Sequence, residues 1–263
     1  MNEILTKVLV CFLAGAGAGI GTGFAGMSAA GIIGPLLLTF CGIPAYQAIG
    51  IGLASDVLAS AVSAMVYKKH GNLDIRHAWV LILCVLSMTI VGSYIASFLP
   101  EHTMSGLSQF GLLVIGIKFL VKPGRKVQEG NGQQQKAYLI KSIIGGLFVG
   151  FICGFVGAGG GMMLLFVLTT FLGYEMHLAV GTSVLIMTFT ALIGGSSHIV
   201  IGGMPDVLCL VLCIVFTLIW ARIASQIANK VSEKVLCRIA GAVMFTSSLV
   251  VIVMNYGPMI WNR

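Results

Sequence analysis

Runs of apolar residues about as long as a lipid bilayer is thick dominate this sequence. Two of them, 79–98 and 236–254, contain about 20 residues each, and a helix of about that length crosses a hydrocarbon core of about 30 Å. Apolar residues make up 58% of the 263 residues and charged residues only 9%, against roughly 25% charged in an average soluble domain. Because so few charges cannot cover a water-soluble fold, we predict an all-α, polytopic transmembrane helix bundle surrounded by lipid.

The apolar runs predict a series of helical segments, two of which are too short to span a bilayer alone. We expect helices at 4–23, 29–41, 46–67, 79–98, 106–121, 142–154, 161–172, 178–200, 207–228 and 235–254. The short segments, 29–41 and 161–172, need protein around them at membrane depth. The first run has no isolated cleavage site after it, so we interpret it as a membrane helix and not as a signal peptide.

The basic residues cluster in particular connections, which predicts the orientation of the chain. Three connections hold most of them: Lys68, Lys69 and Arg76; Lys118, Lys122, Arg125, Lys126, Lys136 and Lys141; and Arg222, Lys230, Lys234 and Arg238. The connections around Glu101 and Asp206 contain no Lys or Arg. The positive-inside rule places the basic loops in the cytoplasm and both termini outside, in a bacterial inner membrane. This distribution explains the net charge of +7 without a nucleic-acid partner.

The two halves of the chain resemble each other when Gly15 is aligned with Gly146, which we call the repeat alignment. Eleven identities then coincide without a gap, most of them glycines. The connection near Gly71 is basic, whereas its counterpart near Gly202 holds only Asp206, so the two halves are expected to have opposite orientations. We therefore predict a first transmembrane repeat at 1–121, a cytoplasmic linker at 122–141 and a second, inverted repeat at 142–263, an architecture that recurs in transporters.

Glycines have two expected roles in this sequence. Gly15, Gly19 and Gly23, and in the second half Gly146, Gly150 and Gly154, recur every four residues. Such ridges let two helix backbones approach closely in lipid. The denser cluster 157–161, Gly-Ala-Gly-Gly-Gly, favours a break in the helix, since each glycine costs about 1 kcal/mol against Ala. The matching segment of the first half, 27–30, is Met-Ser-Ala-Ala and is expected to break its helix less severely.

The sequence around this cluster resembles the sulfite exporter TauE/SafE family. The resemblance rests on residues 155–161 (FVGAGGG), followed by 179–183 (AVGTS). In the first half, Pro35, Ala48, Gly50 and the loop 71–76 are similar to the first repeat of the same family. The resemblance covers nearly the whole chain and implies transport of small sulfur-containing or carboxylate anions. The first repeat lacks the three consecutive glycines, and Ile51-Gly52 stands where Thr-Ser is expected.

A break before a short helix is a suitable place to bind an anion. The backbone N–H groups at such a break lie at the positive end of the helix dipole. We predict a substrate site formed by Gly157, Gly159, Gly160, Gly161, Thr182 and Ser183, with Ser28 as the first-half contribution. No Lys or Arg lies between Lys141 and Arg222, so neutral groups would have to coordinate the anion. Alternatively, the cluster forms a tight hairpin and the hydroxyls bond the carbonyl one turn back.

Asp56 lies in the middle of the expected helix 46–67, well before Lys68. A carboxylate at that depth is costly and is a functional hypothesis by default. Three roles are open for this carboxylate: it carries a coupled proton, it binds a cation, or it bonds the neighbouring Ser55 and Ser60. We predict the proton-coupling role. The function we expect is therefore a secondary transporter of a small anion.

Other classes of function receive less support from the sequence. An anion channel or a membrane subunit of a larger complex is the alternative, and a homo-oligomer is left open. The histidines are scattered, the seven cysteines have no metal-binding spacing, and no catalytic motif is present. We therefore predict no enzymatic activity, no metal and no cofactor.

Overall fold

The computed structural model describes residues 2–76, 78–96, 105–121, 133–156 and 160–261. Every regular element in these ranges is an α-helix, which confirms the all-α prediction. The helices are α1 (Asn2–Ala25), α2 (Ala30–Cys41), α3 (Ala45–Lys69), α4 (Trp79–Ala96), α5 (Ser105–Val121), α6 (Gln133–Val156), α7 (Gly160–Thr170), α8 (Met176–Gly202), α9 (Val207–Ala228) and α10 (Glu233–Trp261).

The outer surface of the bundle is apolar. On α9 the side chains of Leu208, Val211, Val215 and Ile219 recur every three or four residues, and all four are exposed. In water such a stripe would be strongly unfavourable, whereas lipid covers it at no cost. Among the described residues, parts of α1, α3, α8 and α9 are long and apolar enough to cross a membrane. These observations confirm the predicted multi-pass membrane bundle.

The helices pack in five principal pairs. Helix α1 lies along α9, α6 along α4, α3 along both α8 and α9, and α5 along α10. The predicted glycine ridges form the first two contacts. A Cβ on Gly15 or Gly19 would lie 2.6 Å from an atom of α9, and one on Gly146 would lie 2.7 Å from an atom of α4. These glycines therefore have the close-packing role expected from their spacing.

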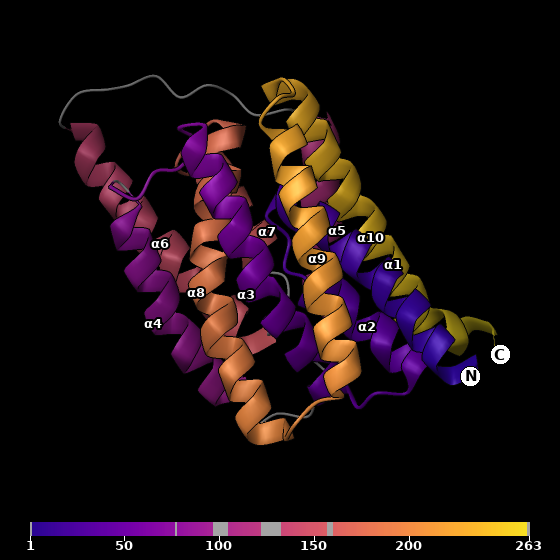
Figure 1. Ribbon diagram of the computed structural model, residues 1–263. Coiled ribbons are helices and arrows are strands. Elements are labelled where there is room, and N and C mark those ends of the chain that lie inside the picture. The colour runs from indigo at the N-terminus through magenta and orange to yellow at the C-terminus, as the bar shows by residue number, and fades with distance from the viewer. Residues whose placement is uncertain (1, 77, 97–104, 122–132, 157–159, 262–263) are drawn as a thin grey trace.

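The ends of the bundle differ in charge. The start of α1 and the end of α10 lie at one end (Figure 1), which we call the terminal end. The connections from α3 to α4 and from α9 to α10 lie at the opposite end (Figure 1). They contain or flank Lys68, Lys69, Arg76, Lys230 and Lys234, so we call it the basic end.

The two short helices are present, with 12 residues in α2 and 11 in α7. Some helix ends differ from the expectation. Helix α6 begins at Gln133, within the segment 122–141 predicted as a linker, and α10 continues to Trp261. Apolar runs mark the part of a helix that lies in lipid, but a helix continues through polar residues as long as its backbone bonds are made.

Candidate functional site

The first half of the chain is interrupted between α1 and α2. Gly26 adopts φ +59°, a conformation that glycine accepts without strain. Its N–H donates to the Thr22 carbonyl at 3.0 Å, and the Met27 N–H donates to the Gly21 carbonyl at 3.1 Å, a glycine-terminated helix end. The sequence predicted a milder break centred on residues 27–30. The interruption is complete because Gly26, one residue earlier, ends the helix.

The second half is interrupted at the predicted place. Helix α6 is described to Val156 and α7 from Gly160, and a Cβ on Gly160 would overlap the sulfur of Cys153. Residues seven apart in one continuous helix cannot approach so closely, so the two helices are separate. Gly157 and Gly159 lie outside the described residues. Gly160 and Gly161 are buried in the first turn of α7, so the positive end of this helix faces the interior of the bundle.

The two interruptions touch each other. A Cβ added to Gly161 would overlap the carbonyl oxygen of Gly26 and would lie 2.5 Å from the sulfur of Met187. A Cβ added to Gly26 would overlap the hydroxyl oxygen of Ser183 on α8. The structure therefore brings together backbone and side-chain groups from α1, α7 and α8, and glycine is required at both contacts.

Asp56 and Ser28 lie side by side at this meeting point. Both are buried, with exposed fractions of 0% and 5%. The Asp56 carboxylate is next to the Ser28 hydroxyl and the Ala29 backbone N–H, but neither of its oxygens makes a hydrogen bond of normal geometry to a described residue. Buried polar groups in proteins are nearly always bonded, so this pair has unused capacity for a proton, a water molecule or a solute.

The alternative structural role of Asp56 is not observed. The Ser55 hydroxyl donates to the Ile51 carbonyl at 2.8 Å. The Ser60 hydroxyl donates to the backbone carbonyl of Asp56 at 2.6 Å and lies 3.0 Å from the Thr188 hydroxyl. Both serines therefore bond the backbone of their own helix and leave the carboxylate without them.

The two predicted hydroxyls of α8 have different surroundings. Ser183 donates to the Val180 carbonyl at 2.9 Å and faces Gly26, as described above. The Thr182 hydroxyl accepts from the Asp74 backbone N–H at 3.2 Å, in the connection between α3 and α4. Thr182 thus bonds the connection at the basic end, while Ser183 lies against Gly26 at the meeting point.

No described residue at the meeting point is open to solvent. Gly26, Ser28, Asp56, Gly160, Gly161 and Ser183 are all buried. An apolar crevice lies elsewhere, between α1, α2 and α10, and is lined by residues such as Ile20, Pro35 and Val243. Within the described part of the chain, no group of His, Cys, Asp and Glu side chains could hold a metal ion. Protein therefore surrounds the described residues of the meeting point.

Comparison with known proteins places the chain in a family. The family described as sulfite exporter TauE/SafE matches residues 11–251. The chain belongs to this family of membrane transporters. It is 27% identical over 210 residues to the Probable membrane transporter protein YdhB of Bacillus subtilis (strain 168), covering 76% of this chain and 81% of that protein.

No solved structure matches the chain. A second relative has a lower sequence identity than the first. The Probable membrane transporter protein YunE of the same organism is 21% identical over 169 residues, covering 59% of this chain and 62% of that protein. The family match and the apolar helices agree, so the chain is a multi-pass membrane protein.

Sequence reasoning missed three groups around the site. Gly26 coincides with Gly157 in the repeat alignment, but only its backbone conformation shows that it ends α1. Met187 was not considered, because nothing in the sequence indicates that its sulfur reaches Gly161. The buried Tyr67 hydroxyl donates to the Gly23 carbonyl at 2.9 Å; a tyrosine near a helix end gives no sequence signal for such a long-range bond.

Proposed function

We propose that this protein is a secondary transporter of a small anion, a sulfur-containing oxyanion or an organosulfonate. The observation that carries the proposal is the buried meeting point of two helix interruptions, with the unpaired carboxylate of Asp56 beside it. Interrupted helices at membrane depth are tolerated where they bind a solute or line its path. The name of the family, sulfite exporter TauE/SafE, supports the choice of anion class.

The anion would be held by neutral groups. The start of α7 supplies a positive dipole end and the N–H groups of its first turn, including Gly160 and Gly161. Ser183 and Ser28 would donate their hydroxyl hydrogens, and the proposed set is completed by Gly157, Gly159 and Thr182. Charge-assisted hydrogen bonds of this kind are roughly twice as strong as neutral ones, so a small oxyanion can be held without a buried Lys or Arg.

Asp56 would couple transport to protons. An ionised carboxylate beside an anion is repelled by it, while a protonated one is neutral and can donate a hydrogen bond. Binding of a proton to Asp56 would therefore favour binding of the anion, and release of one would favour release of the other. The neighbouring Ser28 hydroxyl and Ala29 N–H would stabilise the carboxylate when the site is empty.

The two halves would move relative to each other as inverted repeats. In the repeat alignment, α1 corresponds to α6, α3 to α8, α4 to α9 and α5 to α10. Exchanging the two halves turns the α1–α9 contact into the α6–α4 contact. The same exchange leaves the α3–α8 and α5–α10 contacts unchanged. This exchange of contacts supports a two-fold arrangement, in which rocking exposes the site to each side in turn. The basic end would face the cytoplasm of a bacterial cell and both termini the outside.

Flux measurements in proteoliposomes test the proposal. Purified protein should take up radiolabelled sulfite, thiosulfate or an alkanesulfonate in a saturable manner, and an imposed pH gradient should drive accumulation. The Asp56→Asn variant should lose the response to the gradient, by about tenfold or more, because the amide cannot exchange a proton. Ser55→Ala, next to Asp56 in α3 and with its hydroxyl bonded to the Ile51 carbonyl of its own helix, is the control and should keep the response.

Two results would contradict the proposal. Flux indifferent to the gradient in both the original protein and Asp56→Asn would remove the coupling role. Unitary currents in planar bilayers, in place of saturable exchange, would indicate a channel.

A further inference from the structure

The connection between α3 and α4 lies across the first turns of α8 at the basic end. We call residues 70–76 the strap. Its closest contact is at Gly181, where an added Cβ would overlap the Asn72 carbonyl oxygen and would lie 2.9 Å from the Tyr67 Cβ. One residue further on, the Thr182 hydroxyl accepts from the Asp74 N–H at 3.2 Å. The strap can reach α8 this closely only because residue 181 has no side chain.

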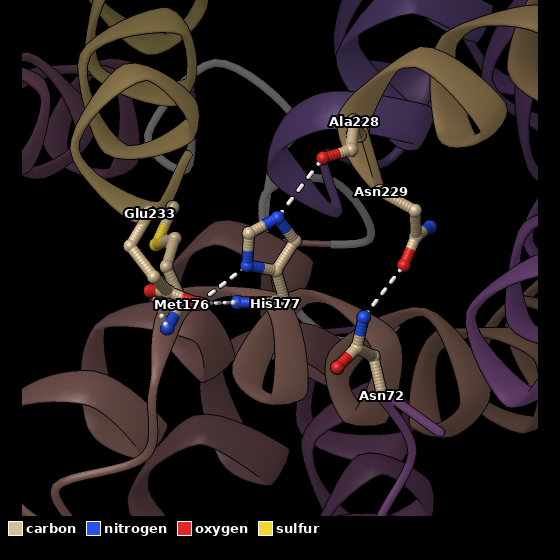
Figure 2. Close-up of polar contacts among 6 residues, drawn as sticks. All are labelled: Asn72, Met176, His177, Ala228, Asn229 and Glu233. Atoms are coloured by element: carbon tan, nitrogen blue, oxygen red, sulfur yellow. Dashed lines mark hydrogen bonds and ion pairs between the residues drawn. The ribbon is translucent and has the colours of Figure 1, made fainter. Parts of the chain in front are cut away.

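Besides its bond to α8, side-chain hydrogen bonds hold the strap to two other parts of the molecule. The Asn72 amide donates to the Asn229 side-chain oxygen, at the end of α9, at 2.7 Å (Figure 2). The Tyr174 hydroxyl, from the connection between α7 and α8, donates to the Asp74 carboxylate at 3.1 Å and lies 2.8 Å from the Tyr138 hydroxyl. The strap, which belongs to the first half of the chain, is therefore attached to elements of the second half.

A second set of contacts fixes the start of α8 beneath the strap. The Glu233 carboxylate accepts from the backbone N–H groups of Met176 at 2.6 Å and His177 at 3.2 Å, and its side chain also bonds the His177 ring (Figure 2). The other ring nitrogen of His177 lies 3.0 Å from the Ala228 carbonyl. Glu233 thus caps α8, so the strap rests on a firmly positioned helix.

The strap lies between the meeting point and the basic end. Thr182, which bonds it, is adjacent to Ser183, which contacts Gly26. Tyr67, which packs under it, reaches Gly23 with its hydroxyl. The opposite, terminal end is held by other contacts, among them an ion pair between Lys7 and Asp206 at 2.9 Å.

We propose that the strap is the gate that controls access to the transport site from the basic end, with Gly181 and Thr182 as its positioning residues. The proposal rests on the proposed function, since a gate presupposes a solute path. A short connection held by a few side-chain bonds opens locally at a lower free-energy cost than a packed helix pair. Detachment of the strap from Thr182 and Asn229 would uncover Ser183, and its return would close the site again.

Thiol accessibility tests the gate without any transported anion. In a variant whose native cysteines are replaced, Ser183→Cys provides a reporter thiol, and a membrane-impermeant maleimide is applied to vesicles of either orientation. Adding Gly181→Ala, which forces Asn72 away, should raise the labelling rate about tenfold from the basic side. Thr182→Val removes one bond without a steric overlap and should raise it by about threefold.

Gly31→Ala is the matched control, because nothing lies within 4 Å of its added Cβ, and it should leave the rate unchanged. Monodisperse elution of each variant shows that it is folded. Unchanged labelling in both Gly181→Ala and Thr182→Val, or an increase only from the terminal side, would overturn the gate. If the unsubstituted protein carried no flux of these anions while labelling increased as expected, the proposed anion class would be refuted, and control of access from the basic end by the strap would be supported.

Discussion

The described residues next to the two helix interruptions differ in their chemistry. In the first half, Gly26 turns the chain and the interruption is followed by Ser28, which faces Asp56. In the second half, α7 begins with two buried glycines, and Met187 packs against Gly161. An ionisable side chain therefore lies beside the first interruption, whereas the described start of α7 packs against a thioether.

Corresponding positions show where the two halves differ. In the repeat alignment, Asp56 corresponds to Met187, and Gly52 corresponds to Ser183. The first half thus has a carboxylate where the second has a thioether, and the second half has a hydroxyl where the first has a glycine. The two halves of a duplicated fold can therefore have different functions. We propose proton binding for the first half and anion binding for the second. The following predictions test this division, beginning with the largest effect.

The contact between the interruptions should tolerate no additional atom. Gly161→Ala places a methyl group on the Gly26 carbonyl oxygen. Because both partners are backbone, relief requires a shift of whole helices, and we expect a loss of about 3 kcal/mol in unfolding free energy. Thermal denaturation in detergent measures it. Gly31→Ala, with open space around the new methyl, should be neutral or stabilising by up to about 1 kcal/mol; equal melting temperatures would refute the contact.

The two serines should affect different steps of transport. Ser28→Ala should reduce gradient-driven accumulation about tenfold, because Ser28 is the hydroxyl next to Asp56, and should raise apparent KM less than Ser183→Ala does. Ser183→Ala should raise apparent KM about tenfold, since a hydrogen bond to a charged group contributes about 1.5–3 kcal/mol. Initial rates in proteoliposomes with and without a pH gradient separate the two effects. Identical behaviour of the two variants would abolish the proposed division.

Tyr67 should stabilise the first interruption. Tyr67→Phe removes the donor to the buried Gly23 carbonyl, and a buried acceptor left without its partner costs about 1–3 kcal/mol. The melting temperature should fall accordingly. Ser55→Ala is the comparison, because the Ser55 hydroxyl bonds its own helix at the Ile51 carbonyl and its removal should change stability little. A Tyr67→Phe protein as stable as Ser55→Ala would show that the bond contributes nothing.

The smallest effect is expected at the terminal end, where Lys7 bonds Asp206 at 2.9 Å. The Cys209 N–H and then Lys7 hold the pKa of the Asp206 carboxyl below its ordinary value. The stabilisation that the ionised Asp206 carboxylate provides is therefore fully present at pH values above the ordinary pKa of an aspartate. It is lost as the pH falls through the lowered pKa of Asp206 in the folded protein. Because the pair is partly exposed, Asp206→Asn should cost less than about 1 kcal/mol.

Melting curves at neutral and acid pH test this prediction. The difference between the original protein and Asp206→Asn should be present at neutral pH and vanish in acid. A difference that persists in acid would assign the effect to something other than the ionised carboxylate. At the basic end, Tyr138 corresponds to Lys7 in the repeat alignment and bonds a tyrosine hydroxyl, so an ion pair like that of Lys7 is not formed at this position.

The sequence by itself determined the class of the protein, the membrane helices, the ridges of glycine and the break before Gly160. These follow from local properties: the length of apolar runs, the spacing of small residues and the poor helix propensity of consecutive glycines. It also selected Asp56 and Ser28, because a carboxylate in an apolar helix and a hydroxyl near a break are conspicuous. The division into repeats at 1–121 and 142–263 remains a prediction.

Only the tertiary structure decided which of these groups meet. Gly26 and Gly161 are far apart in the chain, and their contact depends on how α1, α7 and α8 pack. The same packing turned Thr182 toward the strap and Ser183 toward the interruption, although the two are adjacent in sequence. Neighbouring residues on a helix point about 100° apart, and the surroundings that each one reaches are set by the other helices, about which local sequence carries no information.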